Sequence, residues 1–439
     1  MSAKELLREL LPIALKRTPR PRYCAGIRRR QYSGFLPPDR NEPSQILPSS
    51  QTNRENRTLQ IPLSSPDVRE EDRDAVLEVL NSPFLSLGPK LPAFEQAVAQ
   101  VTKSQNAIAV NSGTSGLHLC VKAAGISDGD EVITSPFSFV ASANCVLFER
   151  GRPVFVDIDP LTYNIDPARI EEAITERTKA ILPVHVFGRP CNLSAIMKIA
   201  AKRGLTIIED SCEAIGARYG GRPVGTFGQT GVFAFYPNKQ LTTGEGGVIV
   251  TNDCEVAERC RAWRNQGRSY GDGWLEHVTI GYNYRLSDIN CALGISQLRR
   301  LVEVMAARAR VAELYAEALR DVPTVIAPPL DEPGSTISWF VYVVRLADDF
   351  GREHRDAAIL ELKKRGIGCR NYFPPIHLQP LYRNQFHFHK GEFPITEHVS
   401  ERTIALPFFN NLSEGEIDFV CATLRNVLRS FTTRMAVAS

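Results

Sequence analysis

Short apolar segments alternate with amphipathic segments between residues 107 and 210, and this alternation restricts the possible folds more than any other feature of the chain. The pattern predicts strands and intervening helices. The strands are expected at 107–110, 131–134, 153–156, 180–186 and 205–208, and the helices at 117–124, 139–150, 167–173 and 194–203. Strands joined through helices pair in parallel, and ligands bind at the carboxyl ends of such strands. We therefore predict an α/β fold with its functional site at that edge of the sheet.

A loop of small residues follows the first predicted strand. Residues 111–116 read Asn-Ser-Gly-Thr-Ser-Gly and lead directly into a predicted helix. The first N–H groups of a helix are unpaired, and the positive end of the helix dipole lies behind them, so such a loop can bind a phosphate. An ordinary N-capped turn has the same composition, so both interpretations stay open at this point.

Two ionisable residues further along fit the same edge of the sheet. Asp210 follows the apolar strand at 205–208. A carboxylate at this position is expected either to be charged and paired with another group or to cap the next helix. Lys239 lies between strand-like segments at 231–236 and 248–251. It could be a surface lysine at a strand end. An amine held among aromatic residues is less stable as a cation, however, and its neutral form can attack a carbonyl. A lysine, a buried acid and a phosphate loop together are the parts that pyridoxal phosphate (PLP) requires.

The second half of the chain predicts a smaller α+β domain. A long helical pattern runs from 289 toward 319, with Ser287 or Asp288 as its cap, and a proline-rich link follows at 323–333. Further elements are expected as strands at 338–346 and 368–372 and helices at 356–365 and 414–428. The predicted domains are a large PLP-binding domain at 58–320, a small domain at 321–432 and a tail at 433–439. The histidine-rich segment 386–389 is predicted to be a surface loop without a metal.

The first 57 residues differ in composition from the remainder. Residues 1–40 hold ten basic and three acidic residues, and proline, serine, asparagine and glutamine dominate from 36 to 56. Leucines between 6 and 15 mark one face of a short amphipathic helix. Three interpretations compete: a disordered extension, a transit peptide, and an arm that binds an anionic surface or a partner.

Composition excludes several classes of protein. The formal net charge of the 439-residue chain is only +3, which argues against a nucleic-acid-binding protein. No apolar run reaches the roughly 18 to 20 residues of a membrane span. The ten cysteines form no CxxC pair and are typical of buried thiols in a reducing compartment. We predict a soluble, cytoplasmic protein with no metal site.

Several motifs in a fixed order resemble the DegT/DnrJ/EryC1/StrS family of sugar aminotransferases over roughly residues 58–430. The main ones are FLSLGPKLPAFE (84–95), NSGTSGLHL (111–119), IIEDSCEAIGARYGGRPVG (207–225), FAFYPNKQLTTGEGGVIVTND (233–253), GYNYRLSDINCALGISQL (281–298) and PPIHLQPLY (374–382). The resemblance implies the aspartate aminotransferase-like fold (PLP fold type I), with a mostly parallel sheet in the large domain. It also implies PLP as the cofactor and a homodimer with shared active sites.

The resemblance assigns roles to individual residues. Lys239 is similar to the lysine that forms the Schiff base and later moves a proton, and Asp210 to the partner of the pyridinium nitrogen. The phosphate loop corresponds to Gly113, Thr114 and Ser115.

Further positions are similar to residues around the cofactor or the substrate. Phe139 corresponds to an aromatic ring that stacks on the cofactor, and Asn283 to a residue that reaches the neighbouring subunit's phosphate. His377 could approach the sugar, although packing is an equal alternative. Two positions depart from the common pattern: Ala234 replaces a phosphate-binding serine, and Glu213 replaces glutamine or histidine, so its contact with the cofactor stays open.

The resemblance implies an aminotransferase, because a branch of the family with histidine in place of the lysine performs dehydration instead. The expected substrates are a nucleotide-linked keto-deoxysugar and an amino-acid donor such as glutamate, for surface polysaccharide or glycoconjugate biosynthesis. Alternatives are amino transfer to a cyclitol or another small ketone, and a non-catalytic regulatory protein of the same fold.

Overall fold

The computed structural model describes residues 60–268 and 276–438, and side chains as far as residue 433. Residues 57–439 form one compact unit. The predicted N-terminal extension at 1–57, with its three interpretations, lies outside the described residues. The boundary predicted at 320/321 remains a prediction.

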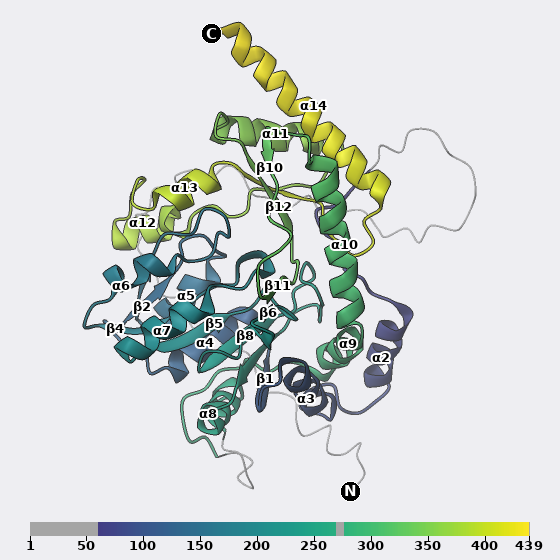
Figure 1. Cartoon of the computed structure of the whole chain (residues 1–439). Coiled ribbons are helices and arrows are strands. Elements are labelled where there is room, and N and C mark those ends of the chain that lie inside the picture. The colour runs from purple at the N-terminus through teal and green to yellow at the C-terminus, as the bar shows by residue number, and fades with distance from the viewer. Residues whose placement is uncertain (1–59, 269–275, 439) are drawn as a thin grey trace, which may run out of the picture. The chain divides into compact units, whose positions relative to one another are not determined.

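A seven-stranded sheet forms the centre of this unit (Figure 1). Its strand order is β1-β9-β8-β5-β4-β2-β3. The strands are β1 (Asn106–Val110), β2 (Glu131–Thr134), β3 (Arg152–Phe155), β4 (Thr178–Ile181), β5 (Thr206–Asp210), β8 (Thr230–Ala234) and β9 (Gly247–Thr251). Only β9 runs antiparallel to its neighbours, β1 and β8. The predicted α/β class with a mostly parallel sheet is therefore confirmed.

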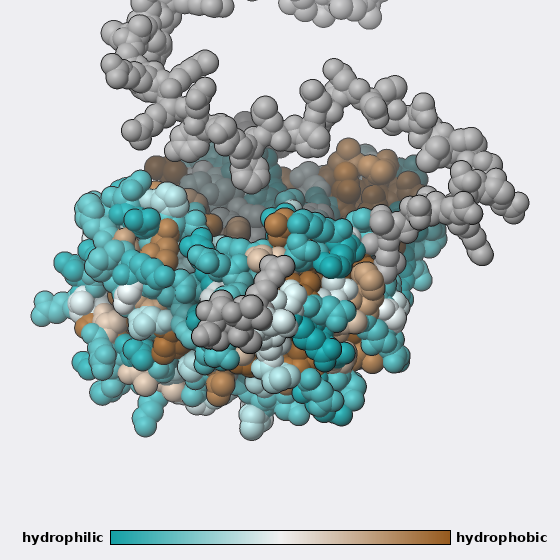
Figure 2. Space-filling model, turned by 90° about the horizontal axis from the view of Figure 1, so that it is seen from above, coloured by the Kyte–Doolittle hydropathy of each residue, from teal (hydrophilic) through white to brown (hydrophobic). Residues whose placement is uncertain are grey.

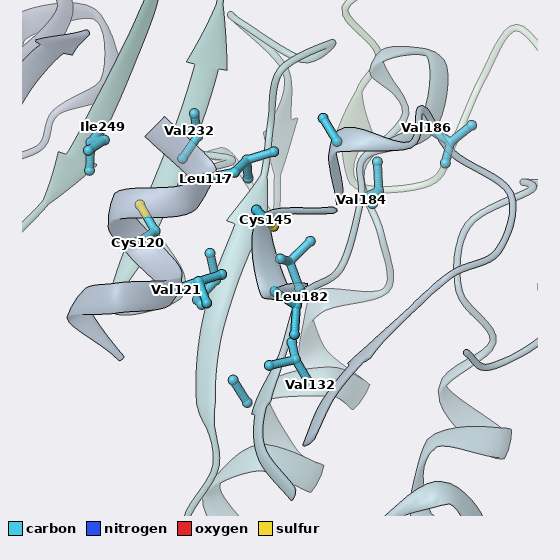
Figure 3. Packing of buried hydrophobic residues seen from close by; sticks show 14 of the residues in the cluster. Leu117, Cys120, Val121, Val132, Cys145, Leu182, Val184, Val186, Val232 and Ile249 are labelled. Carbon is cyan, nitrogen blue, oxygen red and sulfur yellow. The ribbon is translucent and has the colours of Figure 1, made fainter. Parts of the chain in front are cut away.

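Helices cover both faces of this sheet. They are α3 (Lys90–Thr102), α4 (Gly113–Ala123), α5 (Ala141–Phe148), α6 (Ile170–Ala173), α7 (Leu193–Arg203), α8 (Cys254–Arg264) and α9 (Asp288–Arg299). Helix α2 (Glu70–Leu80) packs on α9 instead. Figure 3 shows how α4 packs on the sheet: Leu117 and Cys120 lie near Val232 of β8 and Ile249 of β9. All four side chains are almost completely buried, so burial of apolar area fixes α4 on the strands.

Two glycines allow the strands beside the loops to approach closely. A Cβ on Gly231 would lie 2.1 Å from the carbonyl oxygen of Gly225. A Cβ on Gly247 would lie 2.5 Å from the carbonyl oxygen of Ser112, in the loop before α4. Glycine at these positions brings β8 and β9 against the loops that surround the site.

A second, three-stranded antiparallel sheet has the order β10-β12-β13. Its strands are β10 (Val325–Ile326), β12 (Tyr342–Leu346) and β13 (Thr403–Leu406), and its main helices are α10 (Leu301–Leu319), α11 (Arg352–Lys364) and α14 (Glu414–Ala438). The short helices α12 (Pro380–Phe386) and α13 (Pro394–Ser400) precede β13. A third small sheet joins β11 (Ser335–Thr336), β6 (Arg218–Tyr219) and β7 (Arg222–Pro223).

Several predicted elements need correction. The helical pattern from 289 toward 319 is two helices, because the chain turns at Arg300 between α9 and α10. The strand predicted at 368–372 is reduced to one bridge, between Arg370 and Ala405. Helix α14 continues to Ala438, so the expected tail is helical up to that residue. Sequence patterns did not identify α8, whose outer face carries many charges, or the short α12 and α13.

The exposed face shown in Figure 2 is mostly hydrophilic, and the described cysteines are free thiols. Hydrophilic residues cover most of the face nearest the viewer in Figure 2, with apolar residues between them singly or in small groups. All nine cysteines of the described part are free thiols. Within that part, no helix is both long and apolar enough to cross a membrane.

Candidate active site

A pocket of about 560 Å³ lies where the chain leaves the carboxyl ends of β1, β2, β5 and β8. It brings together most of the residues predicted for the cofactor site. Those that line it are Gly113, Thr114, Phe139, Asp210, Glu213 and Lys239. Parallel strands place their carboxyl ends at one edge, which explains how residues more than a hundred positions apart meet here.

Lys239 lies at the floor of this pocket with its side chain 13% exposed. Its Nζ is 3.4 Å from Oε1 of Glu213 and 4.0 Å from the ring centre of Phe340. The next residue fixes the loop, because the side-chain amide of Gln240 donates to the carbonyl oxygens of Glu213 and Ser338. The amine is thus held in a pocket rather than in solvent, against the simpler interpretation of a surface lysine.

Glu213 is buried beside this amine. Its Oε2 accepts a hydrogen bond from the backbone N–H of Phe187 at 2.9 Å. Burial raises the pKa of Glu213 above its usual value, while Lys239 acts in the opposite direction. A carboxyl group with a raised pKa can hold a proton, so its presence near an anionic oxygen is less unfavourable than the sequence suggested.

Asp210 is 4% exposed and forms no ion pair with any described residue. Its Oδ2 accepts a hydrogen bond from the hydroxyl of Ser142 at 2.7 Å, and its Oδ1 accepts one from the N–H of Cys212 at 3.1 Å. Turns and not a helix follow Asp210, so it stabilises a turn rather than capping a helix, and it also lines the pocket. A buried carboxylate that lacks a cationic partner fits a protonated ring nitrogen of a bound cofactor.

The N-terminus of α4 forms another wall. Ser112 caps the helix by accepting from the N–H of Ser115 at 3.1 Å, while the hydroxyl of Ser115 donates to Asn111 at 2.7 Å. The residues of this turn that line the pocket are Ser112, Gly113 and Thr114, whereas Ser115 does not line it. The N–H groups of a first helical turn lack partners within the helix, so this end is suited to a phosphate.

Gly113 is closely packed against the residues around it. A Cβ at this position would lie 2.8 Å from Cβ of Ala234 and 2.9 Å from Sγ of Cys212. Glycine therefore allows the first turn of α4 to lie directly against β8 and the turn after Asp210. Phe139 projects from the opposite side with 61% of its surface exposed, so its ring is available to a planar group. The pocket residues thus fit PLP.

Besides Ser115, two predicted residues lie outside the pocket lining. Asn283 is exposed, and its carbonyl oxygen accepts from the side chain of Asn111 at 3.4 Å. His377 is completely buried, with Nε2 3.1 Å from Oε1 of Glu397. This environment favours the packing alternative for His377 over contact with a sugar.

The structure also adds pocket residues that sequence reasoning missed. Phe340, Arg370 and Tyr372 come from the chain around the second sheet, and Asn238 and Ser142 from the first. Ser138 precedes α5 and Ser142 lies in its first turn, and this close spacing was a usable indication, since their hydroxyls lie 2.8 Å apart. The residues from the second sheet carried no comparable local pattern.

Comparison with known proteins identifies the family of this chain. The model of the DegT/DnrJ/EryC1/StrS aminotransferase family matches residues 66–425. The chain is 39% identical over 370 residues to GDP-perosamine synthase of Caulobacter vibrioides, which covers 84% of this chain and 98% of that protein. It is 37% identical over 380 residues to the spore coat polysaccharide biosynthesis protein SpsC of Bacillus subtilis. That match covers 84% of this chain and 97% of SpsC.

A solved structure shares the fold. The PLP-form of Spr1654 from Streptococcus pneumoniae aligns with a TM-score of 0.81 at 27% identity, over 85% of this chain and 99% of that one. The family match covers most of the chain, and the pocket contains a lysine and a buried acid. The chain belongs to the DegT/DnrJ/EryC1/StrS aminotransferase family and is a PLP-dependent aminotransferase.

Proposed function

We propose that this protein transfers an amino group from an amino acid, with glutamate as the expected donor, to the ketone of a nucleotide-linked keto-deoxysugar. The observation that supports this most is Lys239, a buried amine in one pocket with Asp210 and the N-terminus of α4. GDP-perosamine synthase and SpsC favour a sugar acceptor and a role in polysaccharide or glycoconjugate biosynthesis.

Within this proposal the pocket residues divide the work of holding PLP. Asp210 would pair with the ring nitrogen, Phe139 would pack on the ring, and Gly113 and Thr114 would bind the phosphate at the start of α4. Ser115, predicted as a third phosphate residue, would instead support this turn through its hydrogen bonds to Ser112 and Asn111. Ala234 offers no hydroxyl, so backbone N–H groups carry more of the phosphate binding. PLP, when bound, supplies an aldehyde carbon and an electron-accepting ring.

The remaining steps belong to side chains of this protein. Lys239 holds the cofactor through Nζ, and the same nitrogen, once released, takes and returns the proton of the substrate carbon. The carboxylate of Glu213, 3.4 Å away, stabilises the charged form of the Lys239 amine. The Phe340 ring excludes water from the amine on another side.

We further propose a homodimer in which Asn283 of one subunit contributes to the phosphate site of its partner. Its exposure and its position next to Asn111, in the loop before α4, support this role. Cytoplasmic location is proposed on the free thiols of the described part alone.

Amination of a panel of substrates tests the function. Purified protein with PLP is incubated with glutamate and a series of nucleotide-linked keto-sugars, and the products are identified by mass spectrometry. A mass change from ketone to amine on one nucleotide sugar is expected. Amination of free cyclitols or small ketones only would contradict the proposed acceptor, and no reaction with any donor would favour a non-catalytic protein.

A further inference from the structure

The pocket contains very little positive charge for an enzyme with anionic substrates. Of the described residues that line it, only Lys239 and Arg370 are cationic, whereas Asp210, Glu213 and Glu245 are acidic. Under the proposed function, one substrate carries phosphates and the other a carboxylate. Lys239 is occupied by the reaction, so Arg370 is the remaining lining residue able to neutralise such a group.

The main chain of Arg370 is fixed although its side chain is exposed. Its N–H donates to the carbonyl oxygen of Ala405 at 3.3 Å, and the N–H of Ala405 donates back at 2.7 Å. The next residue anchors the same stretch, because the amide of Asn371 donates to the carbonyl oxygens of Ser400 at 2.9 Å and Thr403 at 3.1 Å. The guanidinium group therefore extends from a rigid base at the pocket wall, which lowers the entropy lost on binding.

The Arg370 guanidinium makes no hydrogen bond or ion pair within the described part of the chain, in contrast to the buried Arg308 and Arg189. Arg308 donates to two carbonyl oxygens and to Asn410, and Arg189 pairs with Glu332 at 2.7 Å. The N–H donors of Arg370 therefore have no partner among the described residues, and they can bind a planar anionic group.

A neighbouring group can accept a hydrogen bond from another part of the same ligand. The side-chain oxygen of Asn238 is buried at the pocket surface without a hydrogen-bond partner. Buried acceptors are rarely left unpaired, so a ligand with a donor is expected there. Tyr372 lines the same pocket; burial raises its pKa, whereas the charge of Arg370 and the side chain of Asn238 act in the opposite direction.

We propose that Arg370 binds an anionic group of a substrate, either the phosphates of the nucleotide or the carboxylate of the amino donor. The proposal rests on the proposed function of the same pocket. Both sources present the negatively charged oxygens that a guanidinium recognises through two parallel hydrogen bonds.

The test compares Arg370→Gln with a matched control, Arg365→Gln. Arg365 is similarly exposed and pairs with Glu361 on α11, away from the pocket lining. Binding of GDP and UDP to the PLP-loaded enzyme is measured by calorimetry. The reaction with a panel of amino acids is followed separately, through the loss of the visible absorption of the enzyme-bound cofactor.

R370Q is expected to bind one of the two ligands, the nucleotide or the amino acid, about 10- to 100-fold more weakly. The physical reason is the loss of a charge-assisted pair of hydrogen bonds. A change confined to GDP and UDP identifies the phosphates as the bound group, and a change confined to the amino acid identifies the carboxylate. R370K should recover part of the loss, and R365Q should match the wild type. R370Q equal to the wild type in both assays overturns this inference while leaving the proposed function intact. Wild-type protein that binds neither nucleotide and reacts with no amino acid overturns both.

Discussion

The hydroxyl of Ser142 donates to Oδ2 of Asp210 at 2.7 Å, in a part of the pocket where both side chains are almost completely buried. Ser138 lies in the segment before α5, with its own hydroxyl 2.8 Å from that of Ser142. The short chain of hydroxyl groups fixes the orientation of the carboxylate. An acid that must pair with one atom of a cofactor ring needs such a fixed orientation.

Asp210→Asn should weaken PLP binding much more than Ser142→Ala. Loss of the charged partner removes about 1.5 to 3 kcal/mol, and loss of the neutral hydroxyl about 0.5 to 1.5 kcal/mol. Fluorescence titration of the cofactor-free protein with PLP measures both dissociation constants. An S142A dissociation constant equal to that of D210N would show that the hydroxyl does more than orient the carboxylate.

Lys239→Arg should abolish covalent attachment of the cofactor. Incubation with PLP followed by borohydride is expected to label the wild-type peptide that contains Lys239, as detected by mass spectrometry, and to leave K239R unlabelled. Transaminase activity should fall by at least roughly 10²- to 10⁴-fold, because the proton-transferring amine is also lost. Label on another lysine of the wild type would refute the assignment.

Glu213→Gln should change how stability depends on pH. The pKa of Glu213 is raised above its usual 4.5 by burial, so the folded protein holds a proton that the unfolded chain releases. The free energy of unfolding therefore falls as pH rises from 4.5 through the raised pKa. E213Q cannot ionise and should lack this fall in urea titrations between these pH values.

The exposed pocket residue Glu245 provides the control for this experiment. E245Q should follow the wild-type pH dependence. Parallel curves for the wild type and E213Q would mean that Glu213 releases its proton equally easily in both states.

Mixed dimers should reveal whether Asn283 acts across an interface. Asn283→Asp places a negative charge where a phosphate is proposed and should reduce activity, as should K239R. A dimer of one N283D and one K239R subunit then contains one intact site if Asn283 serves its partner. Each mixed dimer that forms on mixing and refolding is expected to have about half the activity of a wild-type dimer. No recovery would place the effect of Asn283 within its own subunit.

Arg308→Lys should destabilise the protein although the charge is kept. Arg308 is 3% exposed, and burial lowers its pKa to about 10. Its guanidinium donates to the carbonyl oxygens of Trp339 and Phe340 at 2.7 Å each, and lysine cannot satisfy both in this planar arrangement. A loss of about 1 to 3 kcal/mol in the free energy of unfolding is expected in urea titrations. Arg365→Lys, on the surface, should have little effect.

Local sequence determined the central elements of the site. Lys239, Asp210 and the turn at Gly113 each follow a short strand of buried apolar residues, and the side-by-side order of parallel strands places strand ends together. The α/β class follows from the same pattern, because strand and helix periodicities are properties of neighbouring residues.

Tertiary packing alone decided the remaining features. His377 belongs to a conspicuous motif, yet it is buried against Glu397, whereas Arg370 and Phe340 have no conspicuous motif and line the pocket. Both outcomes depend on how the chain around the second sheet meets the first, through contacts such as Gln240 to Ser338. This contact joins residues 98 positions apart. The direction of a side chain in such a region is set by the partners that fold against it, which short-range sequence patterns do not contain.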